Sequence, residues 1–245
     1  MLRNWREFLS AKLRGSKITD LYFRNGFVLH APPEVDLAFL FHEVWLDKVY
    51  DLKGYEISET DLVVDIGANI GVFALYAAYR ASKGEVLAFE PFPANADFLR
   101  QNISESKLTN VTASQKAVAA TGETRQLTVS EEWIKHSLQN DMRGSTTASV
   151  INIECVTLDD VMRGREVCDL LKIDCEGSEY EIFYAASPQT IGKIRRIAGE
   201  YHEIDSNEKN GAYLVKFLEK NNFEIDVFSP FDDNCGAFYA RQICP

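Results

Sequence analysis

The chain has 245 residues, of which 46% are hydrophobic and 26% charged, and 26 basic against 37 acidic side chains leave a formal net charge of −11. This length and composition are typical of one large α/β domain, or of a domain with an extension, and exclude a collagenous or low-complexity chain. The acidic balance argues against general nucleic-acid binding, and no apolar run approaches the roughly 20 residues that span a bilayer.

The first 55 residues are expected to form a cap on the domain that follows. Apolar residues at helical spacing predict an amphipathic helix over residues 2–13, and five basic residues against Glu7 give residues 1–17 a local charge of +4. Such a helix can bind an anionic surface or a partner. We favour packing on its own domain, or on a second subunit in a homo-oligomer. A hairpin turning at Asn25-Gly26 and a mostly helical stretch over residues 33–50 should follow.

From Leu62 onward, apolar strand patterns alternate with helical patterns. Strands are expected at 62–66, 85–90, 111–115, 167–173 and 194–201, and helices at 70–80, 94–104 and 209–221. Two further strands, 126–129 and 150–156, flank a segment without a clear pattern. The helix after residue 173 is expected to begin with a capping box formed by Ser178 and Glu181. The alternation predicts a parallel sheet covered on both faces, with an antiparallel pair, 223–228 and 237–242, at its edge.

A turn with two glycines connects the first of these strands to its helix. Gly67 and Gly71 have the spacing G-x-x-x-G, and they let a ligand approach the backbone closely. The G-x-G-x-x-G pattern of dinucleotide sites is absent, and Asp65 adds negative charge where the phosphates would lie. Glu90 ends the next strand, 25 residues after Asp65, near the offset at which nucleotide-binding folds place an acid on ribose hydroxyls. We therefore expect Glu90 to bind a ribose.

Ionisable residues gather at the ends of two other strands. Asp174 and Glu176 follow one strand, Glu200 and His202 end the next, and residues two apart in an extended chain share a face. Adjacent parallel strands lie about 4.8 Å apart, so these four side chains should converge at the carboxyl edge of the sheet. Lys172 is interior to its strand, where it can cover an outer face instead. Four ionisable groups at one edge predict a functional site.

A further signal comes from five segments: Val63–Gly71, Phe89–Pro91, Thr157–Asp160, Leu171–Glu179 and Gly199–His202. Together they resemble the FkbM family of S-adenosylmethionine-dependent methyltransferases, over roughly residues 44–241. The resemblance implies a Rossmann-like seven-stranded sheet of order 3-2-1-4-5-7-6 with the last strand antiparallel, in a methyltransferase domain 56–245 that follows the cap 1–55. It also implies transfer of a methyl group to a hydroxyl of a sugar, polyketide or related small metabolite.

The same resemblance implies which residues bind S-adenosylmethionine. Asp65 and Gly67 would hold its methionine end, Glu90 its ribose, and Ala117 with Val118 its adenine. Neighbours in the same runs complete the predicted cofactor set: Asn69, Gly71, Pro91 and Asp174.

The acidic edge offers two kinds of chemistry. Asp174, Glu176, Glu200 and His202 present hard oxygen ligands and an imidazole, a set suited to Mg²⁺ or Mn²⁺, which would lower the pKa of an acceptor hydroxyl. Without a metal, the glycine turn, the cap or water would hold these carboxylates. His202 is the predicted base, because imidazole titrates near neutral pH and no other histidine stands at this edge. Neighbouring carboxylates favour its protonated form, and Asp174 is the alternative base.

Two other functions remain open. A nicotinamide-dependent oxidoreductase is disfavoured by the missing third glycine, and a cofactor-binding module without activity is disfavoured by the intact acids at 65, 90, 174 and 176. The expected partner is a small-molecule hydroxyl acceptor, with no nucleic acid and no membrane span, and the acidic body would repel a polyanion. Five cysteines without C-x-x-C spacing indicate reduced thiols in a cytoplasmic protein.

Overall fold

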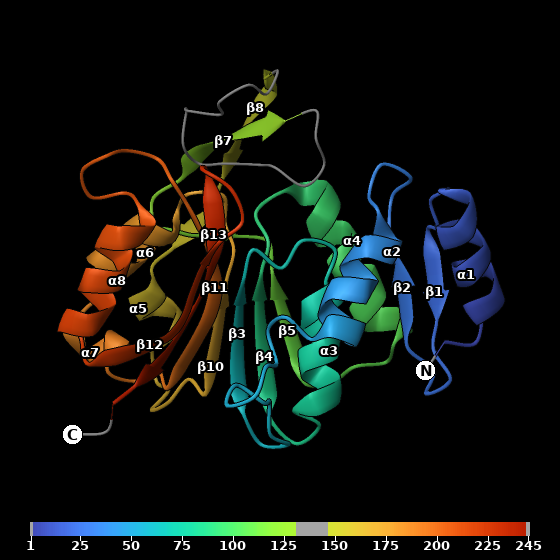
Figure 1. The fold of residues 1–245 in the computed structure, drawn as a ribbon, viewed down its shortest axis with the longest axis horizontal. Helices are drawn as coiled ribbons and strands as arrows, with labels where there is room; N and C mark the ends of the chain where they lie inside the picture. The colour runs from blue at the N-terminus through green and yellow to red at the C-terminus, as the bar shows by residue number, and fades with distance from the viewer. Residues whose placement is uncertain (1, 131–146, 244–245) are drawn as a thin grey trace.

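The computed structural model describes residues 2–130 and 147–243. Seven strands form its main sheet: β3 (Leu62–Ile66), β4 (Glu85–Phe89), β5 (Val111–Ser114), β10 (Leu170–Ile173), β11 (Arg196–His202), β12 (Phe223–Pro230) and β13 (Cys235–Gln242). Their spatial order is β12-β13-β11-β10-β3-β4-β5, which reads 3-2-1-4-5-7-6 from β5 when the strands are numbered along the chain. β13 runs antiparallel to β11 and β12, and the other neighbours pair in parallel. The expected α/β fold around a mostly parallel sheet is confirmed (Figure 1).

The core consists of apolar clusters on opposite faces of this sheet. Val63 packs into one cluster and Val64 into another, because successive side chains of a strand point to opposite faces. Six helices cover the two faces: α3 (Val72–Arg80) and α4 (Pro93–Glu105) on one, and α5 (Leu158–Val161), α6 (Glu179–Ala185), α7 (Pro188–Ile191) and α8 (Gly211–Lys220) on the other. The expected helices after β3, β4 and β11 are present, whereas the short helices α5 and α7 had no counterpart in the sequence pattern.

The N-terminal extension packs on α3 and α4. It contains α1 (Trp5–Arg14), β1 (Asp20–Tyr22), β2 (Val28–His30), α2 (Leu37–Phe41) and the π-helix η1 (His42–Asp47). The predicted helix and hairpin are confirmed. Asn102 of α4 ties down the hairpin, because its side chain accepts the His30 N–H at 2.7 Å and donates to the His30 carbonyl at 3.0 Å. None of the described helices is long and apolar enough to cross a membrane.

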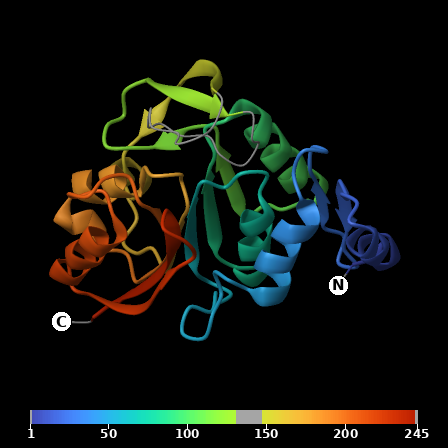
Figure 2. The ribbon, with the colours of Figure 1, turned by 45° about the horizontal axis from the view of Figure 1, so that its top comes forward.

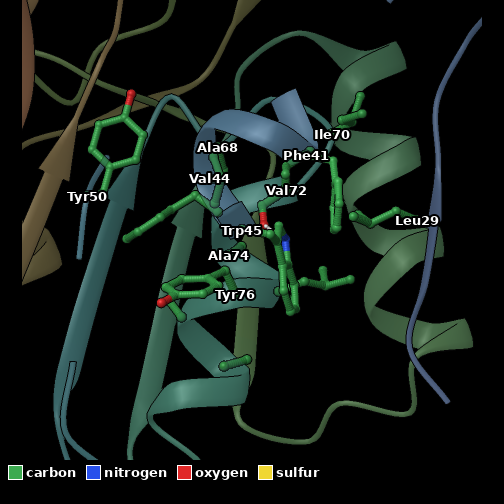
Figure 3. Close-up of a cluster of buried hydrophobic side chains, with 14 of the residues drawn as sticks. Leu29, Phe41, Val44, Trp45, Tyr50, Ala68, Ile70, Val72, Ala74 and Tyr76 are labelled. Atoms are coloured by element: carbon green, nitrogen blue, oxygen red, sulfur yellow. Dashed lines mark hydrogen bonds between the residues drawn. The ribbon is translucent and has the colours of Figure 1, made fainter. Parts of the chain in front are cut away.

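An aromatic cluster holds η1 against α3 (Figure 3). The Trp45 indole N–H donates to the Val72 carbonyl at 3.3 Å, and the Trp45 ring lies 6.2 Å from the Phe41 ring and 5.2 Å from the Tyr76 ring, centre to centre. π-Helical turns are rare and occur often at functional sites. Here the turn buries Trp45 while Glu43, two residues earlier, lines the cavity described below.

The prediction of a capping box formed by Ser178 and Glu181 is wrong. Ser178 has a helical backbone and its side chain makes no capping hydrogen bond, while Glu181 accepts two hydrogen bonds from Arg125, at 2.6 and 2.7 Å. A capping box exists at α5 instead, where Thr157 and Asp160 bond reciprocally. The Ser-x-x-Glu spacing alone did not reveal that a distant arginine would bind the glutamate.

Besides the β1–β2 hairpin, two small sheets accompany the main one in the described residues. β6 (Ala117–Val118) pairs in parallel with β9 (Cys155–Val156), and β7 (Arg125–Ser130) pairs antiparallel with β8 (Thr147–Ile153). The strands expected around 126–129 and 150–156 are therefore present. Residues 131–146, the segment without a clear pattern, lie outside the described residues.

Candidate active site

A cavity of about 530 Å³ opens at the carboxyl ends of β3, β4, β10 and β11. β3 is an interior strand of the sheet with β4 on one side and β10 on the other, so the direction of the strand order reverses at β3. Such a switch point is where open α/β sheets bind ligands. The extension also contributes to the lining through α2 and η1, and the small sheets contribute through β6 and β7.

The turn after β3 forms one wall. Gly67 has φ +80°, and a Cβ there would lie 1.8 Å from the Asp174 carbonyl oxygen, so only glycine fits. Asn69, also at positive φ, donates its N–H to Glu90 at 2.8 Å. Gly71 does not line the cavity; a Cβ there would lie 2.6 Å from Leu99, so this glycine lets α3 and α4 pack closely.

A buried ion pair lies behind this turn. The Lys172 ammonium is 3.3 Å from Asp65, and it donates to the Gly67 carbonyl at 2.7 Å. Asp65 is fully buried, burial raises the pKa of its carboxyl, and neither of its oxygens accepts a hydrogen bond within the described protein. Lys172 lines the cavity and Asp65 does not. The prediction that Lys172 covers an outer face of the sheet is therefore wrong. Asp65 can affect a ligand in the cavity only indirectly, through its ion pair with Lys172.

Glu90 lines the next part of the cavity. Its carboxylate accepts N–H groups of Asn69 and Phe92 at 2.8 and 2.9 Å, and burial raises its pKa to about 7 against the effect of these amides. The wall beside it is apolar and consists of Phe89, Pro91, Ala117, Val118 and Leu127. This combination can hold a flat apolar ring next to a hydroxyl-bearing group.

Two buried side chains in the lining have polar atoms without a hydrogen bond in the described protein. They are the Oδ1 of Asn95, in the first turn of α4, and the Oγ of Ser178, next to α6. These residues are only 3% and 2% exposed. Because buried polar atoms nearly always have a partner, both atoms are available to a ligand.

The other end of the cavity is acidic. Asp174, Glu176 and Glu200 line it together with Glu43 of η1. Burial and the nearby Asp174 raise the pKa of Glu200 to about 8, and the same two causes raise the pKa of Glu43. The Tyr50 hydroxyl donates to Glu200 at 3.4 Å. Mutual repulsion among these carboxylates favours ligands that bring positive charge or hydrogen-bond donors.

His202 lies beside this end and does not line the cavity. Its Nδ1 is 3.1 Å from Glu179, which is fully buried, and its Nε2 is 3.5 Å from Glu176. Burial lowers its pKa, but Glu179 and Glu176 outweigh that effect and raise the pKa to about 10. A cationic imidazole cannot accept a proton, so this geometry does not favour His202 as the base.

The predicted residues that line the cavity are Gly67, Asn69, Glu90, Pro91, Ala117, Val118, Asp174, Glu176 and Glu200. Sequence reasoning missed Lys172, Glu43 and Tyr50. The spacing Lys172-x-Asp174 carried a signal, because residues two apart in a strand share a face. No local pattern placed Glu43 and Tyr50, since only the packing of the extension brings them here.

Solved methyltransferase structures share the fold. The METTL16 methyltransferase domain aligns with a TM-score of 0.54 and 13% identity, over 90% of this chain and 75% of that one. A putative rRNA methylase from Clostridium thermocellum aligns with a TM-score of 0.52 and 12% identity, over 81% of this chain and 96% of that one. At such low identity these matches show the fold alone.

Sequence comparisons identify the family. The methyltransferase sdnD of Sordaria araneosa is 29% identical over 80% of this chain and 85% of its own length. The 31-O-demethyl-FK506 methyltransferase FkbM of Streptomyces tacrolimicus is 28% identical over 77% of this chain and 83% of its own length. The hexuronic acid methyltransferase AglP of Haloferax volcanii is 27% identical over 74% of this chain and 72% of its own length. Residues 65–225 match the model of the methyltransferase FkbM domain. The chain therefore belongs to the FkbM family of methyltransferases.

Proposed function

We propose that this methyltransferase transfers a methyl group from S-adenosylmethionine to a hydroxyl of a small molecule. One observation carries the proposal: a single cavity joins the Glu90 carboxylate and its apolar wall to the acidic end formed by Asp174 and Glu200. A carboxylate suits the vicinal hydroxyls of a ribose, and an apolar wall suits an adenine. Residues 56–245 form the catalytic domain in this proposal, and residues 1–55 form the cap that closes one side of the cavity.

The name of one relative supports a hydroxyl acceptor, because it describes an O-methylation of FK506. The side chains at the acidic end favour a neutral polyol or polyketide over an anion, since Glu43, Glu176 and Glu200 would repel a carboxylate or phosphate. Lys172 offsets only part of this charge, because it is also paired with Asp65.

The proposed chemistry is an in-line displacement. When bound, S-adenosylmethionine supplies an electrophilic methyl group. The protein must align the acceptor hydroxyl with that group and remove its proton. Glu200 is our choice of base, because its carboxylate lines the cavity and Tyr50 orients it; Asp174, beside it, orients the acceptor. His202 is a positioning residue that acts through Glu176 and Asp174.

Turnover should persist after exhaustive EDTA treatment. Three of the four residues expected to offer metal ligands, Asp174, Glu200 and His202, have ligand atoms within 4.8 Å of one another in the described structure. A metal would need a free imidazole lone pair, but carboxylates face both ring nitrogens of His202, at 3.1 and 3.5 Å. Methyl transfer is measured with and without EDTA. Loss of turnover that Mg²⁺ or Mn²⁺ restores would show a metal-dependent enzyme instead.

The cofactor is tested by calorimetry. We expect S-adenosylmethionine to bind the purified protein and NAD⁺ not to bind, because the turn after β3 lacks the dinucleotide glycine pattern. Glu90→Ala should weaken cofactor binding by about 1–3 kcal/mol through lost charge-assisted hydrogen bonds. Glu85→Ala, at the opposite end of the same strand, is the matched control and should bind normally. If both variants bind S-adenosylmethionine with equal affinity, Glu90 does not bind the ribose.

A further inference from the structure

The helix α1 has two apolar sides, and the protein covers only one of them. Phe8 and Ala11 are buried, with the Phe8 ring 5.4 Å from the ring of Phe41. Trp5 and Leu9 are each 45% exposed and Leu13 is 87% exposed. Because residues four apart lie on one side of a helix, these three side chains form a continuous outer stripe.

Basic residues flank this stripe. At 3.6 residues per turn, Arg6 lies along one side of it and Lys12 along the other. The Arg6 guanidinium lies 5.4 Å above the Trp5 ring. Arg3 and Arg14 are also exposed, and none of the ion pairs found among residues 2–130 and 147–243 uses any of these four cations.

Positive charge is concentrated at the end of the chain that contains α1, and the rest of the chain is negative. Residues 1–17 carry +4, which leaves −15 on the other 228 residues. Figures 1 and 2 both place α1 at one end of the molecule, opposite α8. An anionic surface would therefore attract the end with α1 and repel the rest of the protein, which orients the molecule.

We propose that α1 binds the surface of a bilayer that contains anionic lipids. Exposed Trp and Leu side chains between cations are the pattern of helices that lie at a lipid interface. A second copy of the chain would have to offer either an apolar groove shaped to the stripe or its own α1, whose cations would then lie against those of the first copy. Two further cavities of the described structure are lined mainly by polar and charged residues, and one of them adjoins α1 itself. A lipid surface needs no such groove.

Vesicle flotation tests the proposal. Wild-type protein should float with phosphatidylcholine vesicles that contain about 30% phosphatidylserine, and not with pure phosphatidylcholine vesicles. About 0.5 M NaCl should release it, since salt screens the attraction. Leu9→Ser/Leu13→Ser should weaken binding about tenfold or more, because two apolar side chains that would insert among the lipid chains become polar.

A charge-reversal pair supplies the matched control. Arg6→Glu/Lys12→Glu should abolish flotation, whereas Lys216→Glu/Lys220→Glu, the same charge change on exposed positions of α8, should leave it unchanged. Thermal unfolding confirms that each variant is folded. Binding to neutral vesicles alone, equal loss in both charge variants, or no flotation of the wild type would overturn the proposal. An α1-dependent dimer in analytical ultracentrifugation, without flotation, would assign the stripe to a second copy.

Discussion

Glu200→Gln should lower kcat about 10²–10⁴-fold while the affinity for S-adenosylmethionine stays nearly unchanged. The amide keeps the shape of the side chain and its contact with Tyr50 but cannot take the acceptor proton. Turnover is measured as S-adenosylhomocysteine formed with an acceptor found in a panel of sugars and polyketides, and affinity is measured by calorimetry. Glu224→Gln, on the exposed part of β12, is the matched control and should behave like the wild type.

The pH profile adds an independent measurement. Burial and Asp174 raise the pKa of Glu200 to about 8, so kcat/KM should rise as the pH increases through about 8, where the base loses its proton. The Gln variant should lack this rise. If Glu200→Gln keeps near-normal turnover and His202→Gln is inactive, the base is His202. If Asp174→Asn alone is inactive, the base is Asp174.

Lys172→Met should lower the free energy of unfolding by about 3–5 kcal/mol, the typical loss when one partner of a buried ion pair is removed. Asp65 has no other cation within reach in the described structure, and its oxygens accept no hydrogen bond there. Chemical denaturation measures the change. Lys116→Met, which removes the exposed lysine paired with Glu154, is the control and should cost about 1 kcal/mol or less.

The double variant Asp65→Asn/Lys172→Met separates stability from function. Removal of both charges should restore most of the unfolding free energy, because no unpaired charge remains buried. The affinity for S-adenosylmethionine should stay about tenfold weaker or more, since the Gly67 carbonyl loses the ammonium that holds it at 2.7 Å. Normal affinity in the stable double variant would show that Lys172 has only a structural role.

The elements of the main sheet could be predicted because their signals are local. The expected strand 62–66 matches β3 residue for residue. A short apolar run between polar residues and a glycine turn is typical of a buried strand. Glu90 and Asp174 line the cavity as expected, because in parallel sheets the residues that end each strand meet at one edge. Ser178 shows the limit of local signals, as the glutamate expected to complete its capping box binds Arg125 instead.

By itself, the amino-acid sequence determined the α/β class, the family and the edge of the sheet that carries the chemistry, because periodicity and motif spacing are properties of short segments. Only the tertiary structure decided how charge is distributed there. Lys172 and Asp65 form a buried ion pair, and the carboxylates of Glu176 and Glu179 raise the pKa of His202. The packing of η1 on α3 brings Glu43 into the cavity. Burial and the pairing of distant charges depend on the whole fold, so no local pattern encodes them.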